Sequence, residues 1–580
     1  MSATISTNNS IELTSATFKN EMDLKEHSSE PRVGETEPWA YRPSRKLHDP
    51  NITFEEYAYY ASLTRAEEKQ ITNSDPEVFK DSRFSLLNLK RFMDKKTSQT
   101  AAISSTGVLT VSDEEWLQAT RATRNATWGA AFFLITTDLF GPMSVPWAIS
   151  QLGYVPGSFI YVIFGVLAGY NGYQLWTMFL YLDSYRYPLK TYGDLAFRVF
   201  GPWARYLANI VQSVQLFFSV GLLILANGQG ISQLSHGAIC FAVCNLIFTL
   251  AGFLLGQIRT IQRFKWLASL SIWLNIAVMT VTMVGVARYP PNYDAAMAQN
   301  QVAPGQVTTS IGIREGTELS IRVVGLMQGI YSYGGAMLYC EFMNEMKRPW
   351  DFWKSFLCAQ IFITVLYIFY GLFVYSYQGQ FAVLVSNQGI SVYVLQAATN
   401  ALSIVSSLIL ACLYGNIGIK VLYSNVGVEL LSFPDINTTK KGRYLFAALV
   451  PLYWALAFVI CSAIPNITNF SALIASACVI QFTYTFPPIL MLGFAAQKDA
   501  ALNGEGFDAI TGRTIRHDSG LKRWARGLKQ TLKINTFNAV LFLGSICLSI
   551  FGIVASIELL VQTFANNPAI PSFTCVSPVL

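Results

Sequence analysis

Charged residues are scarce in this sequence, and their scarcity sets the first limit on what the protein can be. Asp, Glu, Lys and Arg together make up 13% of the 580 residues, whereas a typical soluble domain contains about 25%. Hydrophobic residues make up 52%, and the mean hydropathy is +0.36. The charge is also segregated, because 19 of the 35 acidic residues lie within residues 1–124. This composition excludes a wholly soluble protein and indicates an integral membrane protein with a polar N-terminal tail.

Metal-binding and disulfide patterns are missing as well. The four histidines lie far apart and outside the apolar runs, and the nine cysteines include no CxxC pair. We therefore expect neither a metal site, nor a cofactor, nor a disulfide framework. No nucleophile–base pair or phosphate-binding loop is apparent, so we do not expect an enzyme. The basic residues lie in short loops beside apolar runs, so the net charge of +6 reports membrane topology rather than nucleic-acid binding.

Three regions follow from this distribution of charge. Residues 1–120 are polar, and we expect a cytoplasmic, largely disordered tail without a cleavable signal peptide, because no basic segment precedes an apolar one. Within this tail, Thr53 and Glu56 fit a capping box at the start of a short helix, and transient helix in a disordered segment is the alternative. Residues 121–564 hold the transmembrane domain, and residues 565–580 form a short non-cytoplasmic tail.

Apolar runs of bilayer length, about 20 residues each, predict eleven transmembrane helices. Lys and Arg support this count, because they gather in alternate loops, above all in residues 498–533, and are absent from the short loops between. The pattern predicts a cytoplasmic N-terminus and a non-cytoplasmic C-terminus. The region 380–425 could hold one span or two. The predicted spans are residues 126–150, 156–181, 206–231, 237–257, 266–287, 323–345, 355–377, 399–422, 444–464, 468–494 and 537–563.

Two of the predicted spans are interrupted, and each interruption lies near an acid. In the first span Asp138 precedes Gly141-Pro142, and the proline removes a helix hydrogen bond and clashes with the preceding turn. In the sixth span Gly334-Gly335 precedes Glu341. Interrupted backbone at bilayer depth is tolerated where it is buried in protein or lines a cavity. Paired interruptions in spans 1 and 6 predict two inverted repeats of five helices, and close packing at glycine is the alternative explanation of either break alone.

We expect the binding site between these two interruptions, where freed backbone groups and helix ends would hold the α-amino and α-carboxylate groups of a substrate. The expected substrate-binding residues are Leu139, Phe140, Gly141, Pro142, Met143, Tyr331, Ser332, Tyr333, Gly334 and Gly335. Five further polar residues face the presumed cavity, each with a structural hydrogen bond as the alternative role. They are Gln212, Gln215, Asn227, Tyr414 and Asn416.

The two intramembrane acids are the expected proton-coupling residues. Asp138 is the first candidate, because apolar surroundings disfavour its charged form and carboxylates inside a membrane are costly and usually functional. Glu341 is the weaker candidate, since it lies close enough to Lys347 and Arg348 for a salt bridge at the membrane rim. A purely structural partnership with Tyr or Gln is the alternative for both acids.

The first interruption also carries a family resemblance. The stretch G-P-M-S-V-P-W-A at residues 141–148, with Q-L-G-Y-V-P-G at 151–157, resembles the G-V-L-S-L-P-Y-A … L-G-W-x-x-G signature of the amino acid/auxin permease family (amino acid/polyamine transporter 2), and looks closest to its fungal branch. The resemblance implies an all-α, APC/LeuT-like integral membrane fold of about eleven transmembrane helices, in a 5+5 inverted repeat with discontinuous helices 1 and 6. Asp138 and Glu341 depart from the family pattern, in which an apolar residue and a proline are usual at these positions.

Together, the resemblance and the paired interruptions predict a secondary active amino acid transporter, with proton-coupled symport of neutral amino acids as the leading hypothesis. Sodium is the alternative coupling ion. The alternative functions are an amino-acid sensor that uses the same site and a transporter of another small amine-containing solute. We expect a multi-pass protein of the plasma membrane rather than the vacuolar membrane, whose partners are an amino acid, the coupling ion and the lipid bilayer.

Overall fold

The architecture is taken from a computed structural model of the chain. It describes residues 48–74, 124–257, 264–428, 433–434, 440–464, 466–566, 573 and 575–579. Most of the predicted disordered tail, namely residues 1–47 and 75–120, lies outside the described residues.

Long apolar helices dominate the described residues. Within these residues, nine helices are long and apolar enough to cross a membrane. Seven are single helices, and two are composites of shorter ones. The single helices are α6 (Tyr154–Leu182), α8 (Pro202–Leu234), α10 (Phe264–Arg288), α14 (Phe352–Gln378), α15 (Tyr393–Leu422), α16 (Lys440–Ala463) and α20 (Leu532–Asn566). The composites are α4 (Trp128–Leu139) with α5 (Val145–Leu152), and α17 (Ile467–Ile474) with α18 (Phe486–Lys498).

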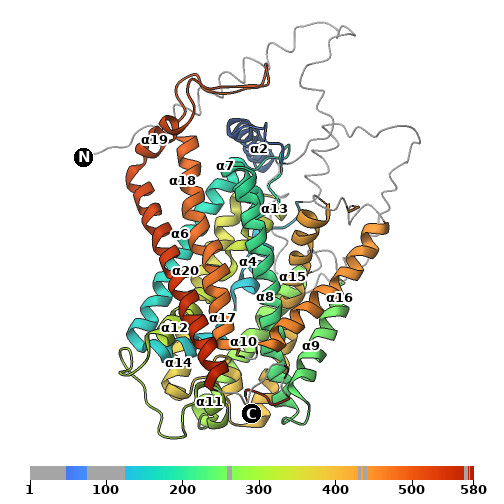
Figure 1. The fold of residues 1–580 in the computed structure, drawn as a ribbon. Coiled ribbons are helices and arrows are strands. Elements are labelled where there is room, and N and C mark those ends of the chain that lie inside the picture. Colours follow the sequence, from blue (N-terminus) through green and yellow to red (C-terminus); the bar gives the residue numbers. More distant parts are fainter. Residues whose placement is uncertain are drawn as a thin grey trace. The chain divides into compact units, whose positions relative to one another are not determined.

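The other two predicted spans are also helical but shorter. α9 (Phe241–Leu255) has 15 residues, and the sixth predicted span is divided into α12 (Leu319–Ser332) and α13 (Tyr339–Glu345). Each of the eleven predicted segments therefore contains helix, and the fold is a helical membrane bundle (Figure 1). That all eleven segments cross the bilayer remains a prediction, and so does the inverted repeat.

Both predicted interruptions are present. After α4, the chain passes through Phe140 and Gly141 into the 3₁₀ turn η2 (Pro142–Ser144) before α5 begins. After α12, the 3₁₀ turn η4 (Gly334–Leu338) leads into α13. The Gly-Pro and Gly-Gly pairs thus mark the two breaks that the sequence indicated.

A third interruption was not predicted. Between α17 and α18 the chain forms two π-helical turns, η9 (Ala475–Val479) and η10 (Gln481–Thr485). Pro487 and Pro488 lie in the first turn of α18. Because neither has an N–H group, two regular helix hydrogen bonds to the preceding turn cannot form. π-Helical turns inside α-helices are frequent at functional sites, and η10 packs against η4.

The segment between α14 and α15 differs from the expected external loop at residues 378–398. It contains the short turns η6 (Gly379–Phe381) and η7 (Ser386–Gly389), and its side chains from Phe381 to Ile390 are almost all buried. Ser386 is fixed by a hydrogen bond of 2.6 Å to the Tyr370 hydroxyl. The segment carries no charged residue, so little opposes its burial, and it folds into the bundle.

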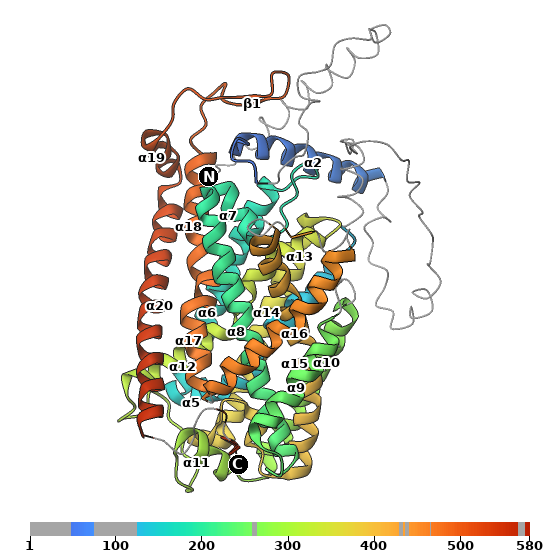
Figure 2. The same cartoon turned by 45° about the vertical axis from the view of Figure 1, so that its right-hand side comes forward.

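One end of the bundle carries α2 (Phe54–Ser74), α7 (Tyr192–Phe200), α13 and α19 (Leu521–Gln530), together with the hairpin β1 (Gly506–Asp508) and β2 (Arg513–Ile515) (Figures 1 and 2). The helix predicted at Thr53 is confirmed: the Glu56 N–H donates to the Thr53 hydroxyl at 3.3 Å. The Glu56 carboxylate does not complete the capping box, because it accepts instead from the Tyr187 hydroxyl at 2.7 Å. Arg516 contacts Glu55 at 2.5 Å, so α2 lies directly on the loop that precedes α20.

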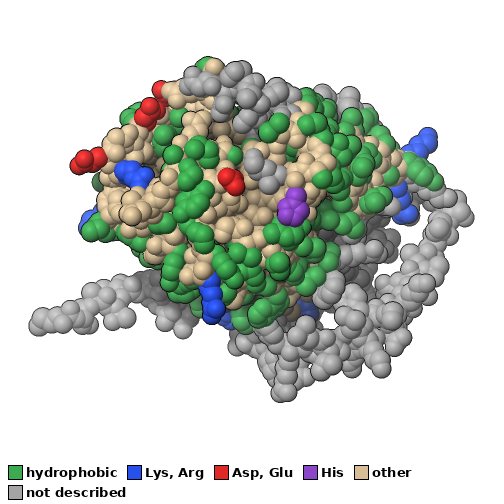
Figure 3. All heavy atoms as spheres, turned by 90° about the horizontal axis from the view of Figure 1, so that it is seen from below, with side chains coloured by type: hydrophobic (Ala, Val, Ile, Leu, Met, Phe, Trp, Pro, Cys, Tyr) green, Lys and Arg blue, Asp and Glu red, His purple; other side chains and the backbone are tan. Residues whose placement is uncertain are grey.

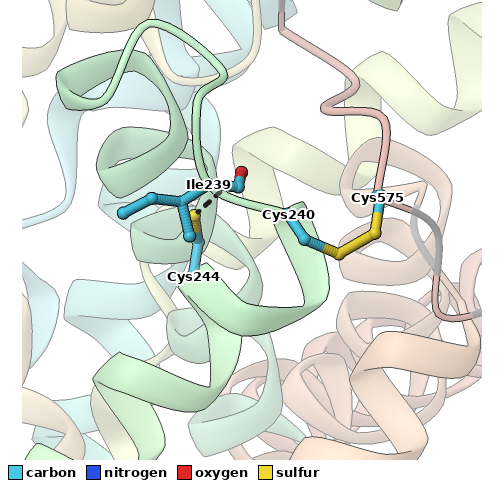
Figure 4. Close-up of a disulfide and its surroundings, with 4 residues drawn as sticks. All are labelled: Ile239, Cys240, Cys244 and Cys575. Atoms are coloured by element: carbon cyan, nitrogen blue, oxygen red, sulfur yellow. Dashed lines mark hydrogen bonds between the residues drawn. A yellow bond between two sulfur atoms is a disulfide. The ribbon is translucent and has the colours of Figure 1, made fainter.

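The opposite end carries α11 (Tyr293–Asn300) and the C-terminal residues (Figure 1). Here the expectation of no disulfide is wrong, because Cys240 at the start of α9 is bonded to Cys575 (Figure 4). The two cysteines are 335 residues apart in sequence, and spacing alone does not reveal the connectivity of such a pair. Two further short turns complete the described elements, namely η5 (Pro349–Asp351) and η8 (Tyr423–Val428).

Candidate functional site

The two predicted interruptions lie against each other. A Cβ atom added at Gly335 would lie within 3.0 Å of the Asp138 carboxylate oxygen Oδ2 and 2.8 Å from Leu139 Cδ2. Real Cβ atoms essentially never approach other atoms this closely, so only glycine fits here without a shift of its neighbours. The backbone of η4 therefore lies directly beside the end of α4.

Tyr367 of α14 joins the two interruptions. Its hydroxyl accepts a hydrogen bond from the Gly141 N–H at 3.0 Å and lies within donating distance of the Leu139 and Ser332 carbonyl oxygens, the latter at 3.2 Å. A phenol has a single proton, so it donates to one of these carbonyls at a time. Backbone groups freed by both breaks thus share one side chain, which ties the two breaks together.

Asp138 ends the first half of the broken span and is buried. Its Oδ1 accepts from the Tyr414 hydroxyl of α15 at 2.9 Å, whereas its Oδ2 has no hydrogen-bond partner among the described residues. A buried ionised oxygen without a partner is costly. This carboxylate is therefore placed to take up a proton or to accept a hydrogen bond from an incoming ammonium group.

Glu341 of α13 is arranged in a similar way. Its Oε1 accepts from the Gln212 amide of α8 at 2.9 Å, and the same amide reaches the Met337 carbonyl at 3.2 Å. Its Oε2 is buried and has no hydrogen-bond partner in the described part of the chain. Gln212 and Tyr414, two of the five polar residues expected at the cavity, thus bind directly to the two acids.

A cavity of about 160 Å³ lies beside the first break. Its wall comes from the turn η2, the helices α8, α12, α15 and α17, and the buried segment between α14 and α15. The polar side chains in the wall are amides and hydroxyls. They are Ser144, Asn227, Gln328, Tyr331, Asn387, Gln388, Asn400, Ser403, Ser407 and Ser471. We call this space the inner cavity.

A second, larger hollow of about 420 Å³ lies toward the end that holds the C-terminus. Ile467 lines both spaces, and Trp147 of the hollow is one helical turn beyond Met143 of the inner cavity. We call this larger hollow the vestibule, because it neighbours the inner cavity on the side of the C-terminal residues.

The ten expected substrate-binding residues occupy different positions around this centre. Gly141, Met143 and Tyr331 line the inner cavity. Tyr333 instead points away, since its hydroxyl donates to the Tyr161 carbonyl at 3.0 Å, and a Cβ at Gly334 would meet Val479. The other five lie in the two breaks, next to the cavity. Each is buried or takes part in the contacts of Tyr367 and Gly335 described above. They are Leu139, Phe140, Pro142, Ser332 and Gly335. Their roles in substrate binding remain predictions.

Sequence reasoning missed two contributors to the centre. Tyr367 is one of 28 tyrosines, and nothing in its neighbourhood marks it as the residue that bridges two breaks. The buried segment contributes Leu384, Val385, Asn387 and Gln388 to the inner cavity. Residues 379–391 contain no charged residue. This could have indicated that the segment is buried, because an exposed loop of that length normally contains charged residues.

A buried ionic cluster lies at the end that carries α2. Both guanidinium nitrogens of Arg124 contact the Asp183 carboxylate, at 2.7 and 2.8 Å, and Arg65 of α2 contacts the same carboxylate at 2.6 Å. Burial alone raises the pKa of the Asp183 carboxyl, but the charge and hydrogen bonds of Arg124 and the charge of Arg65 outweigh it and lower the pKa to about 2. The carboxylate is therefore ionised at all physiological pH values.

The start of the first broken span and the end of the second are joined close to this cluster. The Ala126 N–H donates to the Glu345 carbonyl at 2.8 Å, and the Lys347 N–H donates to the Ala126 carbonyl at 2.9 Å. Both interrupted spans are thus fastened to each other at this end, and α2 is fastened to the same end through Asp183.

Comparison with known proteins identifies the group to which this arrangement belongs. Residues 124–505 match the family described as "Transmembrane amino acid transporter protein". The chain is 23% identical over 393 residues to a "Transmembrane transporter" of Gibberella moniliformis, covering 65% of this chain and 78% of that protein. It is 21% identical over 398 residues to the "N amino acid transport system protein" of Neurospora crassa, covering 64% and 77%. It is also 22% identical over 276 residues to "Lysine histidine transporter-like 3" of Arabidopsis thaliana, covering 44% and 57%.

Proposed function

The chain belongs to the transmembrane amino acid transporter family, and we propose that it is a secondary active transporter that moves small neutral amino acids together with protons. The observation that carries this proposal is the meeting of two broken helices at a single buried carboxylate. Broken spans that meet near a cavity provide helix ends and backbone groups for a zwitterion, and Asp138 lies where they meet.

The composition and size of the inner cavity support a small neutral substrate. Its described lining contains amides, hydroxyls and apolar side chains, and no Asp, Glu, Lys or Arg. A charged substrate side chain would lack an ionic partner there and would lose its hydration. The volume of about 160 Å³ is close to that of a cavity of about 150 Å³ that holds benzene, a molecule about as large as alanine.

The surroundings of Asp138 support the proton as coupling ion. The carboxylate has one neutral donor, Tyr414, at 2.9 Å, and no basic residue is bonded to it among the described residues. Without a basic partner, a buried carboxylate is stabilised by taking up a proton. In this mechanism Asp138 takes up a proton when the cavity is open to the acidic side and releases it when the cavity opens to the other side.

We further propose that the N-terminal tail and the loop at residues 498–533 face the cytosol, while residues 565–580 face the opposite side of the plasma membrane. Direct contact between α2 and the hairpin before α20 supports a common side for the first two. The Cys240–Cys575 bond supports an oxidising compartment for the other end. Seen from that end, the surface shows few charged side chains among hydrophobic and uncharged polar ones (Figure 3), as the charge rule expects of a non-cytoplasmic side.

Uptake into proteoliposomes tests the proposal. The full chain would be reconstituted and each of the common amino acids offered under a proton gradient, a sodium gradient or no gradient, with protein-free liposomes as the control. We expect accumulation of alanine-sized neutral amino acids under the proton gradient alone. Accumulation driven only by sodium would refute the coupling assignment. Substrate binding without uptake or counterflow would instead indicate a sensor.

A further inference from the structure

The segment of residues 575–579 is fastened to the bundle and contributes Pro578 to the lining of the vestibule. The disulfide from Cys575 reaches Cys240 at the start of α9 (Figure 4). The Phe241 N–H donates to the Cys575 carbonyl at 3.2 Å. Just before it, the Phe573 N–H donates to the Ser462 carbonyl at the end of α16, at 2.9 Å. A covalent bond and two backbone hydrogen bonds therefore hold a piece of chain that has no helix or strand of its own.

Beyond the disulfide, the segment turns into the protein rather than into solvent. Val576 is 61% exposed, but Ser577 is 6% and Val579 only 1% exposed. Pro578 lies between these two buried residues and lines the vestibule, together with residues such as Asn466 and Gln562. Ser577 and Val579 thus pack against the protein, and Pro578 between them contributes to the vestibule wall.

Ile467 lines both the vestibule and the inner cavity, so the two spaces are neighbours. We propose that the disulfide-held C-terminal segment forms a wall of the entry route to the inner cavity and restricts the size of the molecules that pass. This proposal rests on the proposed function in one respect, namely that substrate binds in the inner cavity. It adds that residues 576–579 set the width of the entrance, and that the disulfide keeps them in position.

The disulfide matters because a segment without helix or strand holds its place poorly. Hydrogen bonds at exposed ends open locally at little cost, whereas a disulfide persists in an oxidising compartment. Cys244 lies one turn further along α9, where its thiol reaches the Ile239 carbonyl at 3.8 Å and takes no part in the bond (Figure 4). The chain therefore offers a matched control for the loss of a cysteine on the same helix.

Chemical access to the inner cavity tests the proposal without measuring transport. A reporter cysteine would be introduced by Ser144→Cys in the reconstituted full chain, and its reaction with a bulky and with a small membrane-impermeant thiol reagent followed by peptide mass spectrometry. Three changes would be compared with this background: a stop after Cys575, the pair Cys240→Ser with Cys575→Ser, and Cys244→Ser.

We expect the bulky reagent to react severalfold faster in the truncated chain and in the double-serine variant, with a smaller gain for the small reagent and no change for Cys244→Ser. If the truncated chain is not recovered folded, reduction of the full-length protein before labelling makes the same comparison. Unchanged reaction of the bulky reagent after loss of both the segment and the disulfide would overturn the proposal. The outcome is separate from the test of function, since labelling requires an entrance and not a transported substrate.

Discussion

Adding a single methyl group at Gly335 should lower the affinity for substrate. In Gly335→Ala the new Cβ would lie within 3.0 Å of Asp138 Oδ2 and 2.8 Å from Leu139 Cδ2. The carboxylate must then turn away, which strains its hydrogen bond to Tyr414, or the end of α4 must move from η4. Overpacking of this kind costs about 1–3 kcal/mol, so substrate affinity should fall roughly five- to 150-fold, given tenfold per 1.4 kcal/mol. Gly335→Val adds two further carbons and should abolish binding.

Two other glycines provide the comparison for this experiment. Gly544→Ala in α20 meets no atom within 4 Å and should leave binding unchanged. Gly334→Ala would place its Cβ 2.5 Å from Val479 Cγ1, with no contact to Asp138, so it should lower the melting temperature much as Gly335→Ala does while changing affinity less.

Radioligand binding to purified protein, with thermal denaturation measured on the same samples, gives both quantities. If Gly335→Ala bound substrate as tightly as the wild type, the meeting of the two breaks would not be the substrate site.

Three further predictions concern other contacts. Tyr367→Phe removes the hydroxyl shared by the two breaks, so it should destabilise the protein by about 1–3 kcal/mol and slow uptake; an unchanged melting temperature and rate would contradict the bridging role. Asp183→Asn leaves Arg124 buried without its carboxylate and should cost about 3–5 kcal/mol, with faster hydrogen exchange in α2. The pKa of the Asp183 carboxyl is lowered to about 2, so its stabilisation is present above the ordinary carboxyl pKa and is lost as the pH falls toward 2. The difference in α2 exchange protection between the wild type and Asp183→Asn should therefore be the same at pH 5 and pH 8. Cys575 should react with an impermeant thiol reagent on intact cells only after reduction, and failure after reduction would place the C-terminus in the cytosol.

The helix interruptions could be predicted because their causes are local. A proline in an apolar run removes an N–H group and clashes with the preceding turn wherever the run folds, so Gly141-Pro142 indicated a break without knowledge of its neighbours. The same local chemistry identified Asp138 as unusual, since a carboxylate within a bilayer-length apolar run needs a reason to be there. The helix capped by Thr53 was likewise indicated by adjacent residues alone.

What the sequence did not reveal depends on contacts between distant parts of the chain. Tyr414 and Asp138 are 276 residues apart, and no periodicity indicates that one hydroxyl will meet one carboxylate. The Cys240–Cys575 pair is separated even further, and a cysteine at the start of an apolar run looks like any other buried cysteine. Burial of the segment after α14 was missed for a related reason: its hydrogen bonds are made to other helices, such as that of Ser386 to Tyr370.

The central claim is that Asp138 couples proton movement to amino acid movement, and Asp138→Asn tests it most directly. The amide keeps the shape of the side chain and an acceptor oxygen for Tyr414, but it does not take up or release a proton in the physiological range. In proteoliposomes we expect this variant to retain exchange of internal for external amino acid, because exchange needs no net proton movement, and to lose accumulation driven by a pH gradient. Accumulation by Asp138→Asn with the pH dependence of the wild type would contradict the account, and would leave Asp138 as a structural partner of Tyr414.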